Sequence, residues 1–259
     1  MKAVLLYALL ASTSARQRIK RKRSSPQSFA PLCRVPGKNS QGCIRGWTLA
    51  TNSSAFSPCA PDSRDYRKVW PTQHGFYNVI AKDFTYYLDL GLARSLAAFF
   101  VGRSVIEFGA GLGCYAFALR AAGVSLRAYD GSHRLPRATQ GLVLTADLAT
   151  NLTLPEADWV LCLEVAEHVP PEFESTFLSN LNRHARKGVV LSWSSERRGL
   201  GHRNPQSEAY AIGRMQSLGF AFDSSKSEAL RHSASRKGWF RKTLMVFRRE
   251  RAGRSKTFK

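Results

Sequence analysis

The chain has 259 residues, 44% of them hydrophobic and 11% aromatic, which is enough for one α/β domain with extensions or for two small domains. Its 39 basic and 18 acidic residues give a net charge of +21, but this excess is concentrated at the two ends. The first 61 residues include ten basic and no acidic ones, whereas residues 72–249 hold 22 basic and 15 acidic residues. This central part supports nucleic-acid binding only weakly. No run beyond the N-terminus approaches 18 consecutive apolar residues, which argues against a membrane-spanning segment there.

Residues 1–23 have the composition of a targeting segment or a basic tail. Lys2 precedes the apolar run 3–11, and small residues at 12–15 are typical of a signal-peptide cleavage region. The basic run 16–23 opposes export, because positive charges next to an apolar segment are retained on the cytoplasmic side. Abundant Arg and Ser without acidic residues also fits an organelle transit peptide. The secretory pathway, an organelle and a plain tail therefore all stay open.

Residues 24–75 are rich in Ser, Pro, Gly and Asn and lack sustained periodicity, which predicts an irregular extension. With a second basic tail at 250–259, the folded domain is expected at 76–249. Cys33, Cys43 and Cys59 lie in the extension, whereas Cys114 and Cys162 fall in apolar runs typical of a core. Because no C-x-x-C occurs, the sequence predicts no structural zinc site.

Within the expected domain, stretches with helical spacing of apolar residues alternate with stretches typical of strands. Helices are expected at 83–100, 113–122, 170–185 and 207–218. Strands are expected at 104–108, 125–129, 142–146, 158–163, 188–193, 220–222 and 240–248. This alternation predicts an α/β fold, with a mostly parallel sheet and helices on both of its faces.

Four successive expected strands end in an acidic residue: Glu107, Asp130, Asp147 and Glu164. In open parallel sheets, ligands bind outside the carboxyl ends of the strands, where the strand order reverses. Acidic side chains buried there without partners would cost free energy. The sequence therefore predicts that the four carboxylates face one ligand-binding crevice.

The stretch VIEFGAGLGCYA, residues 105–116, places three glycines between the first of these strands and a helix. Such a turn presents free backbone N–H groups to a ligand, often a nucleotide. The dinucleotide fingerprint G-x-G-x-x-G would need a glycine where Cys114 stands, and Glu107 would repel a pyrophosphate. An acid at this place suits a ligand that carries positive charge.

These motifs, in this order, resemble those of the class I S-adenosylmethionine (SAM) dependent methyltransferases. Glu107 to Gly113 is similar to the glycine-rich motif of that family, and Asp130 stands where its acid binds both ribose hydroxyls. Asp147 stands where the family's acid meets the adenine amino group, with Leu148 behind the ring. The resemblance implies a Rossmann-like, seven-stranded, mostly parallel sheet with an antiparallel last strand, and SAM as cofactor. It implies these cofactor-binding residues: Glu107, Phe108, Gly109, Ala110, Gly111, Gly113, Asp130, Gly131, Asp147, Leu148 and Glu164.

The methyl acceptor is less constrained by the sequence. Residues 163–170 resemble the fourth motif of the ubiquinone-pathway O-methyltransferases, and this favours a small-molecule acceptor with a reactive O or N. Glu164, Glu167, His168 and His202 are the expected catalytic residues, and His202 is expected to line the acceptor pocket without a metal.

Two alternatives to this function stay open. The same four side chains resemble the E-x-x-E-H…H metal site of small-RNA 2′-O-methyltransferases, in which a divalent cation would polarise a ribose hydroxyl. A domain that binds SAM without catalysis is the other alternative.

Overall fold

The computed structural model describes residues 33–34, 71–77, 86–235 and 238–250. The expected targeting segment at 1–23, nearly all of the extension up to residue 70, and the tail from residue 251 lie outside the described residues. No helix in the described part is long and apolar enough to cross a membrane.

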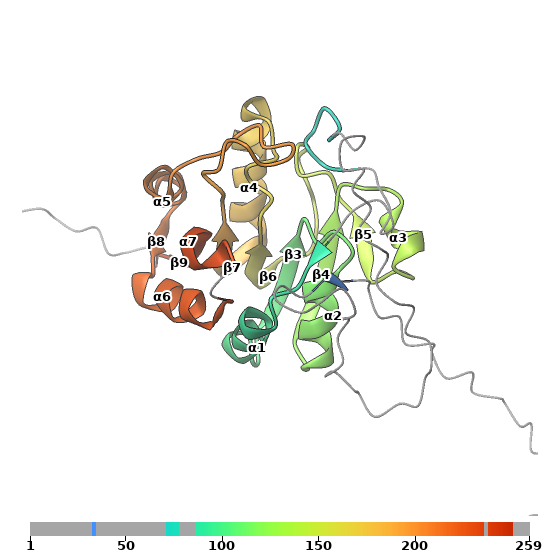
Figure 1. Ribbon diagram of the computed structural model, residues 1–259, viewed down its shortest axis with the longest axis horizontal. Coiled ribbons are helices and arrows are strands. Elements are labelled where there is room, and N and C mark those ends of the chain that lie inside the picture. The colour runs from blue at the N-terminus through green and yellow to red at the C-terminus, as the bar shows by residue number, and fades with distance from the viewer. Residues whose placement is uncertain (1–32, 35–70, 78–85, 236–237, 251–259) are drawn as a thin grey trace, which may run out of the picture.

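A seven-stranded sheet forms the centre of the domain, in the order β5-β4-β3-β6-β7-β9-β8 (Figure 1). Only β9 runs antiparallel to its neighbours β7 and β8. The strands are β3 (Ser104–Phe108), β4 (Ser125–Asp130), β5 (Val143–Thr145), β6 (Ala157–Cys162), β7 (Ala185–Ser192), β8 (Phe220–Phe222) and β9 (Leu244–Arg249). This arrangement confirms the expected Rossmann-like fold with its antiparallel last strand.

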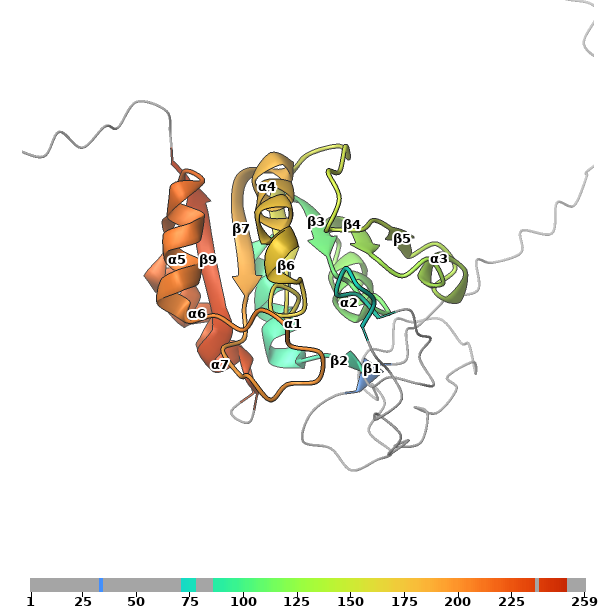
Figure 2. The ribbon, with the colours of Figure 1, turned by 90° about the horizontal axis from the view of Figure 1, so that it is seen from above.

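Helices cover both faces of the sheet and create two apolar cores. The helices are α1 (Leu90–Phe99), α2 (Cys114–Ala121), α3 (Leu135–Ala138), the 3-10 turn η3 (Pro171–Phe173), α4 (Glu174–His184), α5 (Glu208–Ser217), α6 (Ser224–Ser233) and α7 (Phe240–Thr243). One core packs α1, α2 and α6 against the sheet, and the other packs α4 and α5. Figure 2 shows α4 and α5 on the near side of the sheet, with α1 behind it.

The central strand β6 accounts for much of this packing. Its residues Trp159 to Cys162 are at most 1% exposed, as expected for a parallel strand that is covered on both faces. Cys162 is a free, buried thiol, whereas Cys114 at the start of α2 is disulfide-bonded.

Two element boundaries differ from the sequence expectation by four residues or more. The helix expected from residue 83 begins only at Leu90, because the Asp89 side chain accepts the Leu92 N–H at 3.0 Å and caps the helix there. Tyr86–Tyr87 instead forms the short strand β2, which pairs with β1 (Cys33–Arg34). The strand expected from residue 240 begins only at Leu244, after the helical turn α7.

Helix α6 was not predicted from the sequence. Its residues are mostly polar and only Ser227 and Leu230 are buried, so the apolar periodicity that predicts a helix is weak. The capping residue Asp223, whose side chain accepts the Lys226 N–H at 3.0 Å, is the local signal that marks its start.

Candidate functional site

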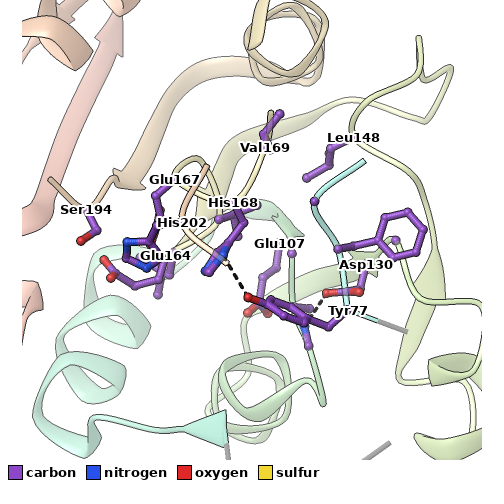
Figure 3. Close-up of a pocket in the computed structure, with 18 of the residues that line it drawn as sticks. Tyr77, Glu107, Asp130, Leu148, Glu164, Glu167, His168, Val169, Ser194 and His202 are labelled. Carbon is purple, nitrogen blue, oxygen red and sulfur yellow. Dashed lines mark hydrogen bonds between the residues drawn. The ribbon is translucent and has the colours of Figure 1, made fainter. Parts of the chain in front are cut away.

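A cavity of about 760 Å³ opens at the carboxyl ends of β3, β4 and β6. The strand order reverses at β3, which has β4 on one side and β6 on the other, so this is the expected crevice. Figure 3 shows Asp130 and Leu148 toward one end of the cavity, and Glu164, Glu167 and His202 at the other. Glu107 and His168 lie between these two groups.

The glycine turn forms the floor of the cavity between β3 and α2. Gly109, Gly111 and Gly113 all have positive φ, at 71°, 53° and 74°, which residues with side chains rarely adopt. A Cβ on Gly109 would lie 2.2 Å from the Val165 side chain, so the close approach of these two segments also requires glycine.

Asp130, at the end of β4, is tied to this turn by backbone hydrogen bonds. Its carboxylate accepts the Gly111 N–H at 2.9 Å on Oδ2 and the Ser132 N–H at 3.0 Å on Oδ1. Burial raises the pKa of Asp130, and these peptide N–H groups oppose that rise. Each oxygen keeps lone pairs that can accept further hydrogen bonds from a ligand.

Glu107 brings a second carboxyl group to the cavity, and it is only 4% exposed. Burial, and then the negative charge of Asp130, raise its pKa to about 8. Its Oε2 is buried and accepts no hydrogen bond from the described part of the chain. Glu107 therefore carries a proton at neutral pH, until a positively charged ligand stabilises the ionised form.

Asp147, after β5, is held by two partners. Its Oδ1 accepts the Ala149 N–H at 2.9 Å, and its Oδ2 lies 2.5 Å from Nδ1 of His74. Leu148 follows it along the cavity wall. The His74 contact was not predicted from the sequence.

Residues 71–77 cover the cavity and join its two ends. Phe76 packs against Gly131, where a Cβ would lie 2.4 Å from the ring. Gly75 lies against the carbonyl of His168, and Tyr77 donates its hydroxyl to the Leu200 carbonyl at 2.7 Å. Burial, and then the charge of Glu167, raise the pKa of Tyr77 to about 12, so its hydroxyl keeps its proton.

The boundary expected between residues 75 and 76 falls within this covering segment. His74 and Gly75, assigned to the extension, line the cavity together with Phe76 and Tyr77.

Glu164, directly after β6, has a left-handed backbone with φ 54°, which is unusual for a residue with a side chain. Its N–H donates to the Ser192 hydroxyl at 2.7 Å, and its carboxylate accepts the Thr243 hydroxyl at 2.9 Å. These contacts with the ends of β7 and α7 hold the unusual backbone and turn the carboxyl group into the cavity.

Glu167, His168 and His202 lie close together at the same end of the cavity. One potential ligand atom from each residue lies within 4.8 Å of those of the other two. Burial, and then the charge of Glu164, raise the pKa of the Glu167 carboxyl. Burial, and then the nearby His202, lower the pKa of His168 to about 4, so its imidazole is neutral at neutral pH.

Two of the expected cofactor residues do not line the cavity. Phe108 is fully buried in the core, where its ring packs against Tyr129 and His184, because its side chain points away from the carboxyl edge. Gly113 instead forms the N-cap of α2, and a Cβ there would lie 2.8 Å from the Val143 side chain. The other expected site residues line the cavity: Glu107, Gly109, Ala110, Gly111, Asp130, Gly131, Asp147, Leu148, Glu164, Glu167, His168 and His202.

Further lining residues come from the C-terminal half of the chain. Ser194, Glu196 and Leu200 lie in the loop after β7. Trp239 and Phe240 contribute aromatic rings.

Comparison with known proteins finds similar solved structures but no matching sequence family. No protein-family model and no curated protein matches the chain. A magnesium protoporphyrin IX methyltransferase from Synechocystis, solved with S-adenosylhomocysteine, is similar at 21% identity and a TM-score of 0.48, over 61% of this chain and 82% of that one. A TehB-like SAM-dependent methyltransferase from Corynebacterium glutamicum gives 15% identity and a TM-score of 0.49, over 62% and 88%.

The glycopeptide N-methyltransferase MtfA, solved with SAM, is more distant, at 14% identity and a TM-score of 0.43, over 60% of this chain and 84% of that one. The strand order and the antiparallel β9 give this chain the Rossmann-like fold of the class I SAM-dependent methyltransferases.

We expect Tyr77→Phe to loosen the covering segment 71–77 without unfolding the domain. The change removes the hydroxyl that donates to the Leu200 carbonyl, a contribution of about 1 kcal/mol. Amide hydrogen exchange should become faster in residues 71–77 and 199–204, while exchange in β6 stays unchanged.

Tyr210→Phe is the matched control, because it also removes a tyrosine hydrogen bond, the one to Glu174 at 2.8 Å. It should leave exchange in 71–77 as it is. Equal exchange in 71–77 for the parent and Tyr77→Phe would show that this hydrogen bond does not hold the cover.

Proposed function

We propose that the protein is a SAM-dependent methyltransferase that acts on an O or N atom of a small molecule. The observation that carries the proposal is the meeting of a glycine turn with carboxyl groups from the ends of β3 and β4 in one cavity. SAM combines a ribose with an ammonium and a sulfonium group. It therefore matches a site that offers carboxylates and backbone N–H groups together.

At the end of the cavity that would hold the cofactor, each carboxyl group contacts a different part of SAM. Asp130 accepts the two ribose hydroxyls, because its oxygens keep lone pairs beside the Gly111 and Ser132 bonds. Glu107 stabilises the positive charge of the ligand. Asp147 accepts the adenine amino group with a lone pair left over by Ala149 and His74, and Leu148 packs against the ring.

At the other end, the protein needs chiefly to align acceptor, methyl group and sulfur, because the sulfonium is already an activated donor. His168 is neutral, so its Nε2 lone pair can accept a hydrogen bond from an acceptor hydroxyl or amine. The cavity of about 760 Å³ is within the range of small-ligand pockets, and residues 71–77 cover it. These features favour a small acceptor over a macromolecule.

Calorimetry with S-adenosylhomocysteine and with NAD tests the cofactor assignment. We expect the parent protein to bind S-adenosylhomocysteine and not NAD. Asp130→Ala should weaken that binding by about 3 kcal/mol, roughly 100-fold, because it removes two hydrogen bonds to a charged group.

Asp158→Ala is the control, because Asp158 lies at the opposite end of β6 and pairs there with Lys187 at 3.2 Å. It should bind S-adenosylhomocysteine as the parent does. Tight NAD binding without any response to S-adenosylhomocysteine would overturn the proposal, and unchanged affinity in a folded Asp130→Ala variant would overturn the ribose assignment.

The raised pKa of Glu107 predicts that cofactor binding releases a proton. The free protein holds that proton below about pH 8, and the positive charge of SAM lowers the pKa in the complex. Affinity for SAM should therefore rise with pH up to about 8 and level off above it, because the complex favours the ionised form.

Calorimetric titration of the protein with SAM at pH 7, in buffers of different ionisation enthalpy, measures the number of protons released on binding. The amino group of the cofactor also titrates near pH 8. The difference between the parent and Glu107→Gln isolates the contribution of the protein, and we expect Glu107→Gln to release fewer protons. Equal proton release by both proteins would assign the effect to the cofactor alone.

A further inference from the structure

The group of Glu167, His168 and His202 joins two segments that are far apart in the sequence. Glu167 and His168 follow β6, and His202 belongs to the loop between β7 and α5. The Glu167 carbonyl accepts the N–H groups of Arg203 and Asn204, both at 2.8 Å, and this fixes the loop beside Glu167. Backbone hydrogen bonds thus hold the part of the loop that carries His202.

Further contacts hold the same loop from its other side. The Asn204 carbonyl accepts the Trp193 ring N–H at 2.7 Å, and the Asn204 amide donates to Glu174 at 2.8 Å. The absence of a side chain at Gly199 leaves space for the His202 ring, because a Cβ on residue 199 would lie 2.2 Å from that ring.

Both histidines have one ring nitrogen against a backbone carbonyl. Nδ1 of His202 lies 2.5 Å from the Glu196 carbonyl, and Nδ1 of His168 lies 3.2 Å from the Gly201 carbonyl. Because a carbonyl only accepts hydrogen bonds, we assign the proton to Nδ1 in each ring. Each Nε2 then keeps a lone pair, and a carbonyl behind a histidine in this way is the usual support of a metal ligand.

The carboxylate of Glu167 supplies an independent observation. Glu167 is 0% exposed, and neither of its buried oxygens has a hydrogen bond of normal geometry from the described residues, although the Ser194 backbone and the Glu164 carboxyl group lie close enough to affect its pKa. A buried carboxylate without such hydrogen bonds is costly, and Glu164 places a second carboxyl group beside it. A bound cation would offset the cost of burying the Glu167 carboxylate and the repulsion between it and the Glu164 carboxylate.

We propose that Glu167, His168 and His202 bind one divalent transition-metal cation, next to the carboxyl group of Glu164. Two imidazoles and a carboxylate suit Zn²⁺, Co²⁺ or a related ion better than Ca²⁺ or Mg²⁺, which prefer oxygen ligands alone. Metal–ligand bonds of about 2.0–2.2 Å place ligand atoms roughly 3–4 Å apart. One potential ligand atom from each residue already lies within 4.8 Å of the other two, so small side-chain movements would bring them to these distances.

A cation here would favour the metal-site alternative left open from the sequence over the expectation that His202 lines the acceptor pocket without a metal. It also selects the kind of acceptor, and this step rests on the proposed function. A hydroxyl bound to the cation would lose its proton more readily, and would lose it to water, because His168 would serve as a ligand. Its oxygen then forms a bond to the methyl carbon, while the carbon–sulfur bond breaks and its electron pair returns to sulfur, which leaves a thioether. The cation thus favours hydroxyl acceptors over amines.

The experiment titrates the untagged, chelator-treated full-length protein with Co²⁺ and follows the visible absorption of the bound ion. We expect one Co²⁺ per chain, which Zn²⁺ displaces, and a rise in Tm of the parent when Zn²⁺ is added. Glu167→Gln and His202→Asn should weaken Co²⁺ binding at least 10-fold and lose the rise in Tm.

His232→Asn is the matched control. His232 also has Nδ1 against a backbone carbonyl, that of Glu228 at 2.8 Å, and a carboxylate nearby, but it lies exposed on α6 outside the cavity. This variant should bind Co²⁺ as the parent does. Absence of a stoichiometric site in the parent, unchanged binding in both site variants, or an equal loss in His232→Asn would overturn the proposal.

S-adenosylhomocysteine binding, measured on the same samples, keeps the two proposals separate. Cofactor binding without Co²⁺ binding would overturn the cation site alone. Co²⁺ binding without cofactor binding would overturn the proposed function and the choice of acceptor, while the cation site would stand.

Discussion

The hydrogen bond from the Gly111 N–H to the Asp130 carboxylate, at 2.9 Å, joins the two halves of the cofactor end. This hydrogen bond ties the turn after β3 to the end of the neighbouring strand β4. Strand β3 pairs with β4 along the whole length of β3. The contact is possible because parallel strands end at the same edge of the sheet, and because glycine accepts the φ of 53° at that point. The floor of the cavity and its first carboxylate are thus positioned together, and the other strand ends are arranged around them.

Desolvated carboxyl groups are the second feature that unites the site. Burial is the largest cause of the raised pKa of Glu107, Asp130, Glu164 and Glu167. Such groups cost stability in the free protein, and a ligand with positive charge relieves that cost. The cofactor end would be relieved by a sulfonium and an ammonium, and the acceptor end by a metal cation. One physical principle therefore underlies both proposals.

The parts of this site that were predictable from the sequence are local in the chain. The sequence alone shows the glycine spacing, the acids at strand ends and the apolar runs. These patterns were enough to place Glu107, Asp130, Asp147 and Glu164 at one edge of the sheet. The contribution of His74 and Tyr77 was not predictable, because their segment has no periodicity and reaches the cavity through contacts with Asp147 and Leu200. Phe108 belongs to the same motif, but the alternation of side chains along β3 places its ring in the core and not in the cavity. His202 was named from a spaced pattern, but its place beside Glu167 depends on two backbone hydrogen bonds that no pattern reveals.

The most direct measurement is transfer of a labelled methyl group from SAM by the full-length protein, supplied with Zn²⁺, to a mixed set of acceptors. The set should contain small hydroxyl and amine compounds, proteins and RNA, separated by size after the reaction. The account predicts label in the small-molecule fraction, chiefly on hydroxyl compounds, together with release of S-adenosylhomocysteine. Label in RNA or protein would contradict a small acceptor. No transfer to any class, with binding of S-adenosylhomocysteine intact, would show a domain that binds the cofactor without catalysis.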